Sequence, residues 1–230
     1  MAIDLICIDA DDTLWHTMRH FEEAAETLLR LEPFADAGSA RERLEAVMVR
    51  NLALYGYGAK SFTLSMLETA TELCGDALPA PTVREILATG RDLLSRPVEL
   101  LPGVEKALDA LAQRGRLVLV TRGELLDQEA KLAGSGLGDR FSGMEIVSDK
   151  TAEVFRRLFA RYNAAPNNCA MAGDSIRSDV LPALEAGAWA AWVPHGIVWS
   201  HERADAPVGH PRFTRVETLA DLPAWIDVIG

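Results

Sequence analysis

Five short runs of apolar residues limit the folds open to this chain more than any other feature of its sequence. They occupy residues 5–8, 117–120, 144–147, 169–172 and 190–193. Each is apolar throughout and bounded by turn-forming residues, which is typical of strands buried on both faces of a parallel sheet. A weaker sixth strand is expected near residues 212–214.

Helical periodicity fills most of the gaps between these runs. One apolar stripe covers residues 104–111 and is ended by Gly115. Similar stripes cover residues 125–132, 154–159 and 180–184. Strands that alternate with helices predict an α/β fold, a doubly wound, Rossmann-like parallel sheet.

Residues 15–96 break this alternation, because they contain helical patterns and no convincing strand. The expected helices are residues 15–31, 40–55, 61–74 and 82–95, with breaks at Pro33, residues 56–58, residues 75–81 and Pro97. We therefore predict a helical domain over 15–96, inserted into an α/β core made of 1–14 and 97–230. Ligands of open α/β sheets bind at the carboxyl ends of the strands, so an insert directly after the first strand can cover a ligand.

The overall charge and composition exclude several classes of partner. A formal net charge of −11 disfavours binding to nucleic acid or to anionic membranes. No apolar run is long enough to span a membrane, and Asp4 and Asp9 interrupt any signal-peptide core. The three cysteines, of which Cys7 and Cys169 lie in apolar runs, predict buried thiols and no disulfide framework. We expect a cytoplasmic monomer or homodimer.

Three carboxylates follow the first strand within four positions, at Asp9, Asp11 and Asp12. Such a group repels itself, and a divalent cation would offset the repulsion. The alternative is an acidic turn that caps the next helix. For an isolated Asp-x-Asp pattern this alternative is the commoner one.

Polar residues also follow the next three strands. Thr121 and Arg122 precede Gly123 at an expected helix start, where a hydroxyl and backbone amides can hold a phosphate; Thr121 could equally be a helix cap. Lys150 can neutralise phosphate charge, or it can be a solvated surface lysine.

The fourth strand is followed by Gly173, Asp174 and Asp179. Gly173 allows the backbone to approach closely, and both aspartates can face one site across the turn. Asp179 alone could also be an acidic residue in the first turn of a helix. Taken together, these signals fall at the carboxyl ends of successive strands, in one crevice, which the separate structural explanations do not predict.

This arrangement resembles the haloacid dehalogenase-like (HAD) superfamily over nearly the whole chain. The family's four motifs are matched in order by Asp9, Asp11 and Thr13, by Thr121, by Lys150, and by Gly173, Asp174 and Asp179. The helical insert resembles the family's cap domain. Asp12 stands where a glycine is common in the family.

The resemblance implies a magnesium-dependent phosphatase that acts on a small phosphorylated metabolite. Asp9 would be the nucleophile and Asp11 the general acid and base. The implied Mg²⁺ ligands are Asp9, the backbone carbonyl of Asp11, Asp174, and Asp179 directly or through water. The implied phosphate-binding residues are Thr121, Arg122 and Lys150.

Three other functions remain open on the sequence alone: a phosphomutase, a dehalogenase, and a catalytically inactive binding or regulatory protein. Asp11 favours a phosphatase over a dehalogenase, since dehalogenases of the family lack an aspartate there. The substrate is not specified by any motif. Candidates for contacting it are His16, Arg19, Tyr55, Tyr57 and Lys60, each of which could equally be a surface or packing residue.

Overall fold

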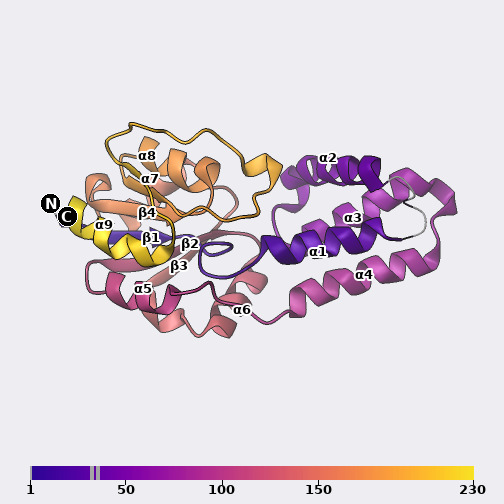
Figure 1. The fold of residues 1–230 in the computed structure, drawn as a ribbon, viewed down its shortest axis with the longest axis horizontal. Coiled ribbons are helices and arrows are strands. Elements are labelled where there is room, and N and C mark those ends of the chain that lie inside the picture. The colour runs from indigo at the N-terminus through magenta and orange to yellow at the C-terminus, as the bar shows by residue number, and fades with distance from the viewer. Residues whose placement is uncertain (1, 32–33, 35–36) are drawn as a thin grey trace. The chain divides into compact units, whose positions relative to one another are not determined.

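The apolar runs form one parallel six-stranded sheet in the computed structural model, which describes residues 2–31, 34 and 37–230. The strands, in the order of the sheet, are β3 (Gly143–Val147), β2 (Arg116–Arg122), β1 (Leu5–Ile8), β4 (Cys169–Gly173), β5 (Trp189–Trp192) and β6 (Phe213–Arg215). Helices flank the sheet on both sides (Figure 1). The predicted α/β class and parallel sheet are therefore confirmed.

Alternate residues of β1 explain how the sheet is covered. Ile6 and Ile8 belong to a core with α5 (Val104–Leu111) and α9 (Leu222–Ile229). Leu5 and Cys7 belong to a second core, on the opposite face, with the helices α7 (Ala152–Arg161) and α8 (Leu181–Glu185). Because successive side chains of a strand point to opposite faces, an all-apolar strand is buried only when both faces are covered.

The edges of the sheet are less buried than its middle. All five residues of β3 are half-exposed, whereas every residue of β1 is buried. A short turn of π-helix, Ile176–Val180, follows β4 and precedes α8, and a helix α6 (Leu125–Ser135) follows β2.

The described chain divides into two compact units. The sheet unit consists of Met1–His16, Val98–Arg122 and Gln128–Gly230, and the helical unit of Thr17–Pro97 with Gly123–Asp127. The helical unit contains α1 (Met18–Leu29), α2 (Ala37–Tyr55), α3 (Ala59–Cys74) and α4 (Ala80–Ser95). These helices bury an apolar core of their own. The break predicted at Pro33 lies outside the described residues.

One local prediction differs from the structure. The first helix of the insert was expected to begin at Trp15, but it begins at Met18, because the Trp15 side chain is buried in the core of the sheet unit and its backbone bridges to Leu100. The polar segment 195–211 lies between β5 and β6. It contains a short turn, Ser200–Glu202, whose glutamate makes partly buried hydrogen bonds described below.

Two further sequence predictions can also be compared with the structure. Cys7 and Cys169 are buried, as predicted, and neither they nor Cys74 form a disulfide. None of the described helices has the length and apolarity that crossing a membrane requires.

Candidate active site

Asp9 and Asp174 are brought together by the pairing of the two central strands. Ile8 and Ala172 are partners in the parallel register of β1 and β4, and the backbone N–H of Asp9 donates to the carbonyl of Ala172 at 2.9 Å. Each aspartate therefore leaves its strand at the same edge of the sheet. Carboxylate oxygens of Asp9, Asp174 and Asp179 lie within 4.8 Å of one another.

Lys150 is buried among these carboxylates. Its ammonium donates to Asp9 Oδ1, and to Asp179 Oδ1 at 2.6 Å. Burial lowers the pKa of Lys150, but the negative charges of Asp179 and Asp9 outweigh this effect and raise the pKa above its ordinary value. Lys150 is therefore a permanent cation at this site.

One lysine does not neutralise three clustered carboxylates. Burial is the main cause that raises the pKa of Asp9 to about 7; Lys150 opposes the rise, and the charge of Asp179 adds to it. Burial, together with the charges of Asp9 and Asp179, also raises the pKa of Asp174 well above its usual range. Clustered oxygen ligands with uncompensated negative charge suit a hard divalent cation such as Mg²⁺. The residues present therefore fit a magnesium ion.

Gly173 leaves no room for a side chain beside this cluster. A Cβ at this position would lie 2.2 Å from Oδ2 of Asp179, whose carboxylate is fixed by Lys150 and by the backbone N–H of Ser175 at 3.0 Å. Sequence reasoning singled out Gly173 for close approach of the backbone. The structure identifies the neighbour that requires it.

We expect Gly173→Ala to weaken both Mg²⁺ binding and folding, because Asp179 cannot move without losing its partners. Overpacking of this kind costs about 1–3 kcal/mol of unfolding free energy, which urea denaturation would measure. Gly138→Ala is the matched control, since a Cβ there meets nothing within 4 Å. Equal stability and equal Mg²⁺ affinity in the two variants would contradict the interpretation.

Asp11 is held apart from the carboxylate cluster by three side chains of the sheet unit. The Trp15 indole donates to Oδ1 at 2.9 Å, Gln128 Nε2 donates to Oδ2 at 2.7 Å, and Lys131 Nζ lies 3.1 Å from Oδ1. Gln128 also donates to the backbone carbonyl of Arg122 at 2.8 Å. The carboxylate of Asp11 therefore has a fixed orientation and a cationic neighbour of its own.

Asp12 explains why glycine suits this position in the motif. Its φ of 61° lies in the left-handed region, where aspartate is tolerated better than most residues with side chains. Its buried carboxylate lies 3.6 Å from Nδ1 of His195, and Thr13 Oγ1 donates to Asp9 Oδ2 at 3.3 Å. The turn of the backbone after Asp11 is thus held by the contact of Asp12 with His195 and by the hydrogen bond from Thr13 to Asp9.

Thr121 and Arg122 occupy the carboxyl end of β2, as predicted, but their side chains have different surroundings. Thr121 is buried and its hydroxyl donates to the carbonyl of Arg122 at 3.2 Å. The Arg122 guanidinium donates to Glu202 Oε1 at 3.1 Å. Phosphate binding by Arg122 stays a prediction.

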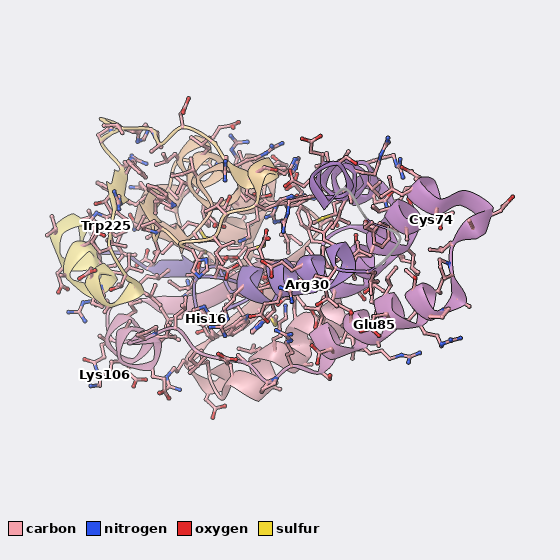
Figure 2. All side chains as sticks on the ribbon, turned by 45° about the vertical axis from the view of Figure 1, so that its right-hand side comes forward. His16, Arg30, Cys74, Glu85, Lys106 and Trp225 are labelled. Atoms are coloured by element: carbon pink, nitrogen blue, oxygen red, sulfur yellow. The ribbon has the colours of Figure 1, made fainter. Side chains whose placement is uncertain are left out.

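The expected substrate-contacting residues belong to both units. His16, labelled in Figure 2, lies in the sheet unit with its ring edge-on to His195 at 5.9 Å between centroids. In the helical unit, Arg19 lies 4.0 Å from Glu23, the Tyr55 hydroxyl donates to Glu68 at 2.9 Å, Lys60 pairs with Glu124, and Tyr57 lies between α2 and α3. A role in substrate binding stays a prediction for each of them.

Five residues that surround the predicted site residues were not identified from the sequence. They are Gln128, Lys131, Ser175, Ser178 and Glu202. A weak signal exists for the first two, because their spacing of three places them on one face of the helix that follows Thr121. Glu202 lies in a polar, irregular segment, where nothing distinguishes it from its neighbours.

Known proteins to which this chain is similar include a phosphatase and a dehalogenase. Glyceraldehyde 3-phosphate phosphatase of Pyrococcus furiosus is 28% identical over 102 residues, a match that spans 42% of each chain. The structure of an L-2-haloacid dehalogenase from Xanthobacter autotrophicus is 17% identical, with full coverage of both chains and a TM-score of 0.66.

Two further matches show the family of this chain. The crystal structure of a haloacid dehalogenase-like family hydrolase from Xanthomonas campestris is 34% identical, covers 99% of this chain and 92% of its own, and has a TM-score of 0.88. A family model described as haloacid dehalogenase-like hydrolase matches residues 3–187. These two matches agree with the carboxylates at the strand ends and with Lys150. The chain belongs to the haloacid dehalogenase-like hydrolases.

Proposed function

We propose that this hydrolase is a magnesium-dependent phosphatase that cleaves a small phosphomonoester through an aspartyl-phosphate intermediate, as a cytoplasmic monomer or homodimer. The observation that carries the proposal is the separation of two aspartates with different surroundings. Asp9 lies in the carboxylate cluster with Lys150, whereas Asp11 is oriented by Gln128 and Lys131. Environments that differ in this way suit a nucleophile and a general acid–base group.

Asp9 supplies the nucleophilic oxygen. This oxygen forms a bond to phosphorus as the bond to the leaving oxygen breaks, and Asp11 gives its proton to that oxygen. Asp11, then ionised, takes a proton from the water that attacks the phosphorus of the intermediate, which releases phosphate and regenerates Asp9. Thr121 and Lys150 hold the transferring oxygens and stabilise their negative charge.

Mg²⁺ would be held by the carboxylates of Asp9 and Asp174 and the backbone carbonyl of Asp11. When bound, it offsets the repulsion between the Asp9 carboxylate and the phosphate and polarises the phosphoryl group. The two carboxylate oxygens of Asp179 already accept hydrogen bonds from Lys150 and from the Ser175 N–H. We therefore assign Asp179 to orienting Lys150 and to supporting the metal through water.

The helical unit would act as the cap that covers the substrate. It follows the first strand of the sheet directly in the chain, as expected for a segment that closes over the carboxyl ends of the strands. His16, Arg19, Tyr57 and Lys60 are the proposed determinants of substrate choice. A panel of phosphomonoesters with free phosphate as the readout would identify the substrate class.

Asp11 is also the residue that favours a phosphatase over the alternatives. A dehalogenase has no leaving oxygen that needs a proton, so a carboxylate oriented by three partners would have no task there. A phosphomutase would use the same groups, but would return the phosphoryl group to the substrate without releasing phosphate. An inactive binding protein would have no need of the full set of charged groups.

Activity is expected to require Mg²⁺ and to disappear in EDTA. The requirement should also depend on pH, because the pKa of Asp9 is raised to about 7 and Mg²⁺ binds the ionised carboxylate. Below that pH the proton and the metal compete, so the Mg²⁺ affinity should fall by up to about tenfold per pH unit for each proton displaced. Above it, Asp9 is ionised and no longer contributes to this competition.

Phosphate release at several Mg²⁺ concentrations between pH 5 and pH 9 would measure this dependence. Full activity towards an aryl phosphate after Mg²⁺ has been removed with EDTA would contradict the metal-assisted mechanism. Halide release from a 2-haloacid, without phosphate release from any phosphomonoester, would establish the dehalogenase alternative instead.

A further inference from the structure

A partly buried glutamate in the segment between β5 and β6 is not explained by the proposed reaction. Glu202 ends the turn Ser200–Glu202, and its side chain is only 11% exposed. Burial of an ionised carboxylate is unfavourable unless partners replace its lost hydration. Glu202 has such partners on two different loops of the sheet unit.

The first partners are two serines that follow Asp174. Ser175 Oγ donates to Glu202 Oε2 at 2.8 Å, and Ser178 Oγ donates to the same oxygen at 2.5 Å. Ser175 also caps the turn, since its Oγ accepts from the Ser178 N–H at 3.0 Å and its own N–H donates to Asp179 Oδ2 at 3.0 Å. Glu202 therefore fixes the path of the backbone from Asp174 to Asp179.

The second partner is Arg122, at the end of β2. Its Nη1 donates to Glu202 Oε1 at 3.1 Å, and its backbone carbonyl accepts from Gln128, which also holds Asp11. Burial raises the pKa of Glu202, but the charge of Arg122 and the hydrogen bonds from Arg122, Ser178 and Ser175 outweigh this and lower the pKa to about 2. The carboxylate is thus ionised at any physiological pH.

A further contact between the same two segments also has its donor in the turn after β4. Arg177 Nη1 donates to the carbonyl of His201 at 2.7 Å. The turn after β4 therefore supplies three hydrogen-bond donors, and the segment before β6 supplies their acceptors. This is more than the packing of a surface loop requires.

We propose that Glu202 is a positioning residue of the active site, which sets the turn between Asp174 and Asp179 and holds the guanidinium of Arg122. Through this turn it fixes the spacing of the carboxylates around Mg²⁺. The inference rests on the proposed magnesium site and not on the identity of the substrate. The segment 195–211 thereby contributes a residue that positions groups of the active site.

Titration of the protein with Mg²⁺ alone, followed by calorimetry, tests this role without any reaction. The variant is Glu202→Gln, because an amide cannot accept hydrogen bonds from the two serines and from Arg122 at once. Loss of a group that orients metal ligands costs about 10–100-fold in metal affinity, and we expect a loss in that range. Glu217→Gln, at a side chain that is 78% exposed and paired with Arg215, is the matched control.

Ser178→Ala is a second variant for the same test, which is needed if Glu202→Gln also weakens the fold. It removes one hydroxyl and leaves the pair of Glu202 with Arg122 intact, so a smaller loss of Mg²⁺ affinity is expected. Because both residues act through one network, the double variant should bind Mg²⁺ about as weakly as Glu202→Gln alone. Thermal unfolding of each variant separates a loss of affinity from a loss of fold.

Mg²⁺ affinity in folded Glu202→Gln equal to that of Glu217→Gln would overturn the inference, as would unchanged affinity in Ser178→Ala or no Mg²⁺ binding by the unmodified protein. Failure of the proposed function has a different signature. The unmodified protein would then bind Mg²⁺ but release no phosphate from any phosphomonoester, while the effect of Glu202→Gln on binding would persist.

Discussion

Asp9→Asn is expected to abolish phosphate release, with a loss of roughly 10⁴–10⁶-fold in kcat, as is found when a catalytic nucleophile is removed. The amide has nearly the same volume as the carboxylate but cannot form an aspartyl phosphate. It also removes one of the charges that Lys150 neutralises. Steady-state phosphate release and acid-quenched mass spectrometry of the Asp9 peptide would measure the two consequences.

The matched control is Asp139→Asn, because Asp139 is an exposed aspartate of the same unit. Its activity should equal that of the unmodified protein. Since removal of Asp9 also relieves repulsion between carboxylates, Asp9→Asn should fold at least as well as the control in the absence of metal. A phosphorylated peptide in the Asp9→Asn variant would show that another residue is the nucleophile.

Asp11→Asn should separate the two chemical steps. The nucleophile and the carboxylate cluster remain, so attack on an aryl phosphate, whose leaving group needs little protonation, should continue. Hydrolysis of the intermediate needs a base, and an amide cannot serve. We expect a loss of about 10²–10⁴-fold on alkyl phosphates, and accumulation of phosphate on Asp9 with an aryl phosphate.

Lys131, one of the residues that orient Asp11, allows a milder variant to be compared with Asp11→Asn. Lys131→Met removes the cation 3.1 Å from Asp11 but leaves Gln128 and Trp15 in place. It should lower kcat less than Asp11→Asn does and should not trap the intermediate. Near-native turnover of alkyl phosphates by Asp11→Asn would remove the main argument against a dehalogenase.

The sheet could be predicted from the sequence because its strands are apolar on both faces. A run such as residues 5–8 has no polar side for a helix or an exposed strand to present to water, so burial in a sheet is the one outcome that suits it. The positions of Asp9 and Asp174 follow from the same fact, since parallel strands end at one edge. Physical constraints of this kind act locally and are therefore visible in a few neighbouring residues.

The groups around the proposed site could not be predicted in this way. Glu202 is 80 residues from Arg122 and 27 from Ser175, so only the folded chain brings the three together. Trp15 looked like the start of an amphipathic helix, but its indole contributes more by burial in the core of the sheet unit, with a hydrogen bond to Asp11. Tertiary burial overrode helical propensity there, which local patterns do not reveal.

The strand order β3-β2-β1-β4-β5-β6 gives the proposed catalytic groups unequal resistance to local opening. β1, which Asp9 follows, is hydrogen-bonded on both sides and fully buried, so its amides should exchange with solvent only through global unfolding. β3, which precedes Lys150, lies at an edge and is half-exposed. Local opening of that edge would release Lys150 while Asp9 stays in place. In the ion pair of Lys150 with Asp9, the lysine is therefore the partner that is lost first.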